Sequence, residues 1–168
     1  MTKKIYTDLI ERLWDQVPNL KWADLWNNQI ENETKELPFD LPAIFLHFKE
    51  GRDNELQQGL IEVTATLTVL IVYENYEDHY QSAGQNVNQS ALDFFDFKDV
   101  VTKALQGFTT DEIRSLQRKA QRADASFSNL YVYELDFDLQ FYDTSAVKND
   151  WIFENPNFIY EKEIVQNI

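Results

Sequence analysis

The sequence predicts an α+β fold: a single domain with a mostly antiparallel sheet of four or five strands and two helices on one face. Three observations support this prediction. Two segments show the apolar spacing of amphipathic helices, and two long segments alternate apolar and polar residues as half-buried strands do. The links between the strands have hairpin length. The chain of 168 residues is 43% hydrophobic and 14% aromatic, which is enough for one ordinary core.

The first helix is predicted over residues 2–17. Ile5, Leu9 and Leu13 recur at four-residue intervals, so they form one apolar face. Pro18 follows, and the residue before a proline is displaced from helical dihedrals. The helix is therefore expected to end there.

Three strands are expected in the first half of the chain. Residues 20–26 suit a short strand, and the apolar run 43–48 suits a central strand covered on both faces. Residues 49–58 are polar and are interpreted as a loop around Gly51. The alternating run 59–73 predicts a strand much longer than the usual 5–6 residues, which is expected to bend or to project beyond the domain.

A second helix and a second long strand are expected further on. The helix is predicted over residues 91–105 and the strand over 129–142. Between them, residues 109–112 have capping-box spacing, which predicts a short helical turn. Residues 117–128 suit either a polar strand or a loop. We expect residues 1–142 to form the domain and residues 143–168 to be a tail that packs on it or on a neighbour.

The composition excludes several classes of function. The chain has 29 acidic and 15 basic residues, giving a charge of −14 that repels nucleic-acid phosphates and anionic membranes. It has no cysteine, which excludes disulfides, thiol catalysis and thiolate metal sites. No apolar run is long enough to span a bilayer, and no apolar stretch follows the charged N-terminus. A cytoplasmic origin is expected.

Few residues suggest catalysis. His47 lies in an apolar strand and is interpreted as a core or edge histidine. His79 follows two carboxylates that could hold a cation, but their spacing matches no loop with a defined ligand order, so a solvated loop is the favoured interpretation. Asp136 and Asp138 resemble a hydrolytic carboxylate pair, but strand alternation places them on a solvent face. Since no nucleotide or hydrolase motif is present, the sequence predicts no enzyme, no cofactor and no metal.

Two features suggest contacts with other molecules. Four basic residues lie within nine positions of an acidic chain; they form either an ordinary solvated face or a docking surface for an acidic patch on another copy, with a DNA contact the least favoured reading. The tail carries aromatic residues outside any periodic element, of the kind that anchor interfaces. The residues expected at an oligomer interface are Arg114, Arg118, Lys119, Arg122, Trp151 and Phe153.

The order of these elements resembles the small tail-terminator (tail-completion) and head–tail joining proteins of tailed bacteriophages and prophages. The features that carry the resemblance are the N-terminal helix ending at Pro18, the run Leu41-Pro42-Ala43-Ile44-Phe45-Leu46, the two long strands and the second helix. They span residues 2–142. The resemblance implies a homohexameric ring in the virion, made in the bacterial host cytoplasm. Such a ring caps the tail tube, meets the head connector and meets DNA only as passing cargo.

Two other readings stay open. A small acidic domain without cysteine could be a monomeric inhibitor or binding module that masks a basic partner. An enzyme using carboxylates around His79 is the third. The binding module requires carboxylates on one continuous face, and the enzyme requires a concave site that includes His79.

Overall fold

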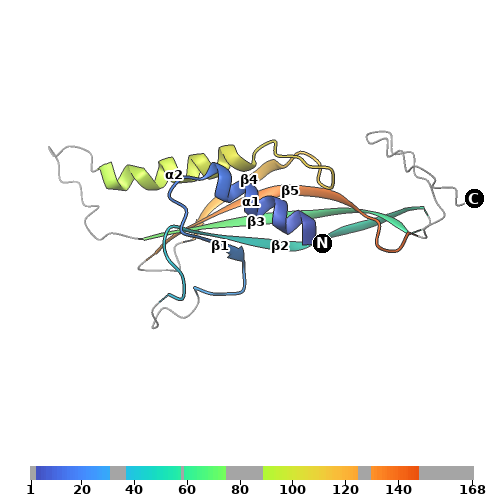
Figure 1. Cartoon of the computed structure of the whole chain (residues 1–168), viewed down its shortest axis with the longest axis horizontal. Helices are drawn as coiled ribbons and strands as arrows, with labels where there is room; N and C mark the ends of the chain where they lie inside the picture. Colours follow the sequence, from blue (N-terminus) through green and yellow to red (C-terminus); the bar gives the residue numbers. More distant parts are fainter. Residues whose placement is uncertain (1–2, 31–36, 58, 75–88, 125–129, 148–168) are drawn as a thin grey trace, which may run out of the picture.

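The computed structural model describes residues 3–30, 37–57, 59–74, 89–124 and 130–147. They form one five-stranded sheet in the order β1-β2-β3-β5-β4, with both helices on one face (Figure 1). All neighbouring strands are antiparallel except β1 and β2, which are parallel. The α+β prediction is confirmed. The elements are α1 (Lys3–Gln16), β1 (Trp22–Leu25), β2 (Ala43–Gln57), β3 (Leu60–Glu74), α2 (Gln89–Leu105), β4 (Gln117–Asp124) and β5 (Leu130–Asp143).

The main core lies between the helices and the sheet. The predicted apolar stripe of α1 is fully buried, and α2 contributes Val101 and Leu105 beside it. The odd-numbered residues of β3 and β5 face these helices, because paired residues of neighbouring strands share a face. Those that the core buries are Leu67, Val69, Ile71, Leu135, Phe137, Leu139 and Phe141.

A second, smaller core covers part of the opposite face. Phe45, Leu70 and Val72 are buried there beneath Ile30 and Phe39, which lie in the connection from β1 to β2. The rings of Phe39 and Phe45 meet edge to face at 4.9 Å. This cover explains why the run 43–48 and the end of β3 are apolar on both faces, and it confirms that these are central strands.

The predicted loop at 49–58 is wrong, because β2 continues to Gln57. Its pairing with β3 shifts between Lys49 and Arg52, which indicates a β-bulge. Gly51 lies at this shift; a Cβ there would be 1.8 Å from the carbonyl oxygen of Thr64. The outer half of β2 is exposed, so its sequence carries no apolar alternation and looks like a loop.

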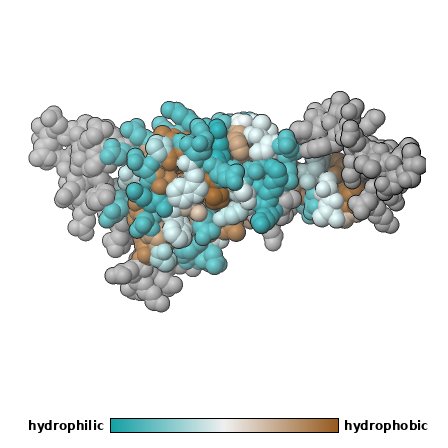
Figure 2. Space-filling model, viewed as in Figure 1, coloured by the Kyte–Doolittle hydropathy of each residue, from teal (hydrophilic) through white to brown (hydrophobic). Residues whose placement is uncertain are grey.

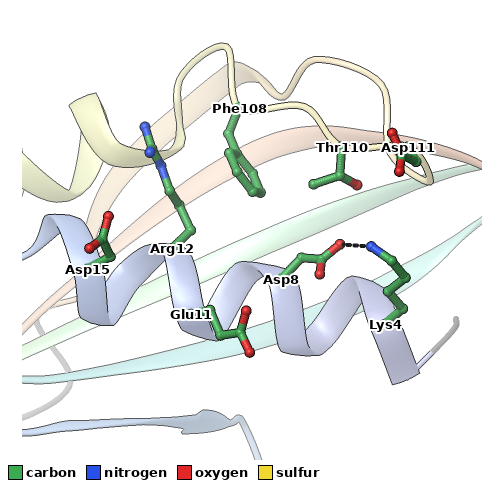
Figure 3. Close-up of a pocket in the computed structure, with 8 residues that line it drawn as sticks. All are labelled: Lys4, Asp8, Glu11, Arg12, Asp15, Phe108, Thr110 and Asp111. Carbon is green, nitrogen blue, oxygen red and sulfur yellow. Dashed lines mark hydrogen bonds and ion pairs between the residues drawn. The ribbon is translucent and has the colours of Figure 1, made fainter.

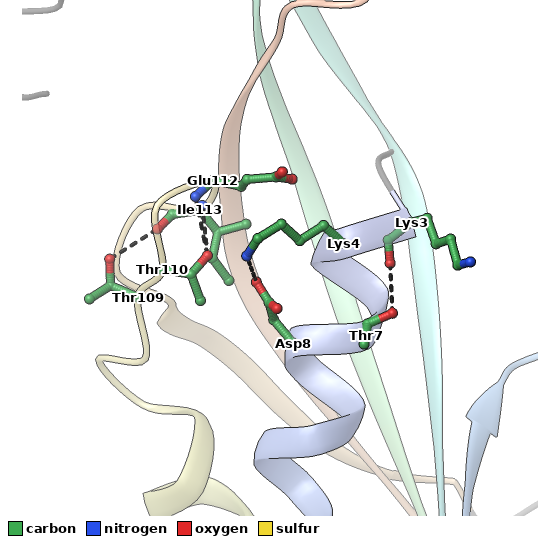
Figure 4. A network of polar contacts seen from close by, with 8 residues as sticks. All are labelled: Lys3, Lys4, Thr7, Asp8, Thr109, Thr110, Glu112 and Ile113. Atoms are coloured by element: carbon green, nitrogen blue, oxygen red, sulfur yellow. Dashed lines mark hydrogen bonds and ion pairs between the residues drawn. The ribbon is translucent and has the colours of Figure 1, made fainter. Parts of the chain in front are cut away.

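The predicted helical turn after α2 is also wrong. Gly107, with φ of 78°, ends the helix, and the chain then forms a bent loop in which the Leu116 amide donates to the Phe108 carbonyl at 2.9 Å. The hydroxyl of Thr110 accepts hydrogen bonds from the amides of Glu112 and Ile113 at 3.2 and 3.3 Å (Figure 4). Ile113 is buried and forms a bridge with Phe141, so burial against β5 replaces the helical turn.

The bulge gives a first prediction. Replacing Gly51 with alanine forces a methyl group into the backbone of β3, so we expect the free energy of unfolding to fall by about 1–3 kcal/mol. Urea unfolding measures the change. Gly107→Asn is the control, since asparagine tolerates positive φ and, apart from the two adjoining residues, the nearest described atom to the new Cβ is Oγ of Ser115 at 4.0 Å. Equal stability of Gly51→Ala and wild type would show that the bulge is not fixed by this glycine.

Candidate assembly surface

The face of the sheet opposite the helices is polar beyond the second core. Alternation places the even-numbered residues of β3 and β5 on this face, from Glu62 to Thr68 and from Glu134 to Tyr142. Lys49 and Arg52 of β2 share it, because they pair with Thr66 and Thr64. The face therefore carries both carboxylates and basic groups.

Asp136 lies at the centre of this face. Its side chain is 14% exposed. The hydroxyl of Thr68, its cross-strand partner, donates a hydrogen bond to Oδ1 at 2.5 Å. Arg122 donates to Oδ2 at 2.8 Å, and Nζ of Lys49 lies 3.8 Å away. Burial alone would raise the pKa of Asp136, but these hydrogen bonds and charges together lower it.

Three of the four clustered basic residues bind carboxylates of this chain. Arg122 also contacts Glu134, and its hydrogen bond to Asp136 is the largest factor that raises the pKa of its guanidinium. Lys119 contacts Asp138.

Arg114, just before β4, is held by several groups at once. It lies 3.4 Å from Glu62, hydrogen-bonds to Tyr142 and stacks over the Tyr142 ring at 5.3 Å. These contacts join the chain before β4 to both central strands. The predicted cluster of basic residues is thus largely an internal network.

Arg118 differs from the other three. It is paired with Phe137, which belongs to the main core, so it lies on the helix side of β4. Its guanidinium is exposed and contacts the amide oxygen of Gln121 at 3.4 Å. Within the described residues it has no ion pair. The oligomer interface stays a prediction, and Trp151 and Phe153 lie outside the described residues.

The sequence missed two exposed carboxylates on the other edge of the sheet. Asp53 and Glu55 of β2 pair with Val63 and Ile61, so they also lie on the helix side. Both are exposed and have no ion-pair partner in the described part of the chain. The polar run 49–58 predicts a loop there, and only the register of β2 shows that Asp53 and Glu55 share a side with Arg118.

An open groove of about 500 Å³ lies between α1 and the segment that follows α2 (Figure 3). Arg12 crosses it, donating a hydrogen bond to the Ala104 carbonyl at 2.9 Å and stacking over Phe108 at 5.3 Å. Lys4 and Asp8 form an ion pair at 2.7 Å on one side. The surface in view in Figure 2 is mainly hydrophilic, with hydrophobic patches between. The carboxylates that line the groove are Asp8, Glu11, Asp15 and Asp111.

The remaining candidates from the sequence give no catalytic arrangement in the described ranges. His47 is half-buried on the polar face opposite Thr68, and His79 lies outside the described residues. Asp136 and Asp138 are both held by basic groups of β4. In the part of the chain that the structure describes, no three His, Asp or Glu side chains are grouped as metal ligands, and no helix could cross a membrane.

Comparison with known proteins gives no family. No protein-family model and no curated protein matches this chain.

The Asp136 network gives a second prediction. Asp136→Asn places a donor against Arg122 and Lys49, so we expect the free energy of unfolding at pH 7 to fall by about 1–3 kcal/mol. The folded pKa of Asp136 lies below its ordinary value of 3.8, so its contribution is complete above that pH and is lost as the pH falls through the folded pKa.

Urea unfolding of the wild type and the variant at pH 7 and pH 3 measures this. The difference between the two proteins should shrink at pH 3. Asp99→Asn, whose carboxylate is 62% exposed, is the control and should change little at either pH. A variant as stable as wild type at pH 7 would contradict the role given to Asp136.

Proposed function

We propose that this protein is a ring-forming structural subunit of a virion, a tail terminator or neck protein that caps the tail tube and joins it to the head connector. Its role is structural rather than catalytic. Its partners are other copies of itself, six in a ring, together with tail-tube and connector proteins. DNA passes through the ring as cargo.

The observation that carries this proposal is the arm formed by the long strands. β3 is buried from Leu67 to Val72 but only half-buried from Leu60 to Thr66. The hairpin of β2 and β3 extends past the N-terminal end of α1 (Figure 1). A sheet that continues beyond its own core exposes backbone groups to a neighbour, and strand addition is a common mode of assembly. The order of the elements supports the same proposal.

The third prediction concerns mass. Light scattering behind a sizing column should give a mass near six times 19.9 kDa, and electron microscopy should show rings. If charge pairs hold the ring, the mass should fall at high salt, since exposed pairs are screened. A protein that remains a monomer at every concentration would contradict the proposal.

One observation favours a second function. The groove beside α1 is lined by four carboxylates and two basic groups, one of which is already paired with Asp8. Such a groove suits a basic segment of a partner, as an acidic binding or inhibitor module requires.

The fourth prediction tests this alternative. If the groove binds a basic segment, a lysine-rich peptide should bind the wild-type protein. The double variant Glu11→Lys with Asp111→Lys should bind it more weakly, and calorimetry measures both affinities. Asp96→Lys with Asp99→Lys on α2 is the control with equal charge change. If the control weakens binding equally, the peptide senses net charge and the groove has no role.

A further inference from the structure

The sheet has two free edges that are unlike one another. β1 pairs with β2 only from Ala43 to Leu46, so residues 47–57 of β2, which pair with β3 on one side, have no strand on the other side among the described residues. β4 forms the opposite edge, and it too has no outer neighbour in the described ranges. Every residue of β4 except Asp124 is exposed. Within the described ranges both edges present backbone groups that no strand pairs, which a further strand can satisfy; the Arg118 amide on β4 already donates to the side-chain oxygen of Gln106 at 3.0 Å.

We propose that β4 of one copy pairs with the free edge of β2 in a second copy, and that Arg118 meets Asp53 and Glu55 across this contact. This proposal rests on the ring proposed above and specifies which two strands meet between neighbouring copies. The contact is head-to-tail, so a rotation that repeats it closes a ring.

The directions of the strands fit such a contact. β2, β3, β5 and β4 alternate in direction, so β2 and β4 run antiparallel within one copy. When neighbouring copies point the same way, β4 of one lies antiparallel to β2 of the next. The sheet then continues across the contact with the antiparallel pattern that it has inside each copy.

The offset between the two edges also fits a closed ring. Gln121, in the middle of β4, is level with Val69 of β3. Asp53, near the middle of the free β2 edge and on the same side of the sheet as Gln121, is level with Val63, six residues before Val69 in β3. This offset is about 20 Å along the strands, against about 19 Å for the width of the four strands β2, β3, β5 and β4 that each copy contributes. Continuous pairing then tilts the strands by about 45°, at the upper end of the range of closed barrels.

The charges select this contact over the two-fold alternatives. Arg118 is a cation without an ion pair on the helix side of β4, and Asp53 and Glu55 are carboxylates without one on the same side of β2. A two-fold pair of β2 with β2 centred on Asn54 would bring carboxylates toward carboxylates, and a two-fold pair of β4 with β4 centred on its middle would place the two Arg118 residues at opposite ends, away from Asp53 and Glu55. Like charges on facing strands are destabilising, whereas opposite charges stabilise the pair.

The fifth prediction is a charge exchange. Arg118→Glu should raise about tenfold the protein concentration at which half of the chains are assembled. The double variant Asp53→Arg with Glu55→Arg should raise it by a similar factor. The three substitutions together should restore assembly. Lys103→Glu, and Asp96→Arg with Asp99→Arg, lie at exposed positions on α2 and carry the same charge changes as the two variants; these controls should assemble like wild type. Light scattering measures the mass, and circular dichroism shows that each variant is folded.

Crosslinking gives a second, independent readout, because the chain has no cysteine. A protein with Arg118→Cys and Asp53→Cys, treated with a short bis-maleimide, should give a ladder up to the full ring. Asp53→Cys alone should give no ladder. If wild type assembles but neither charge variant weakens it and no ladder forms, the edge contact is wrong and the ring remains. If wild type is a monomer throughout, both proposals are wrong.

Discussion

The pairing of β3 with β5 is the constraint on which the rest of this structure depends. Fourteen residue pairs join the two strands without a register shift, from Ile61–Asp143 to Glu74–Leu130. Because side chains alternate along a strand, this register puts every apolar residue of one stripe under the helices. A slip by one residue would turn the apolar stripe of one strand to the face opposite the stripe of the other. It would also separate Thr68 from Asp136. The network of hydrogen bonds through which Asp136 holds Arg122 of β4 would then be lost.

The periodic elements could be predicted from sequence because burial on one side leaves a pattern. The stripes of α1, β3 and β5 each face one core, and all three were predicted with nearly correct bounds. The outer half of β2 and all of β4 could not be separated from loops, since both are exposed. The bulge at Gly51 also shifts the alternation of β2, which hides the strand further.

The candidate surface was predictable in composition but not in arrangement. Four basic residues are close in sequence, yet three turn toward carboxylates of β3 and β5 and Arg118 turns the other way. Glu62, the carboxylate partner of Arg114, lies far away in the chain, so only the strand order brings the two together, whereas the partners of Arg122 lie on β5, the next strand in the chain. The internal pairs also balance charge at the centre of the polar face, so the acidic excess of the chain lies elsewhere.

The separation of β3 from β5 in sequence has a consequence for how the protein is made. The β2–β3 hairpin is local and is complete once Glu74 has left the ribosome. Its central partner, β5, follows only after α2 and β4. Non-local pairing of this kind slows folding, and an unpaired apolar strand invites aggregation while it waits. Newly made chains therefore pass through a stage in which β3 is unprotected, and slower synthesis between residues 75 and 129 would prolong it.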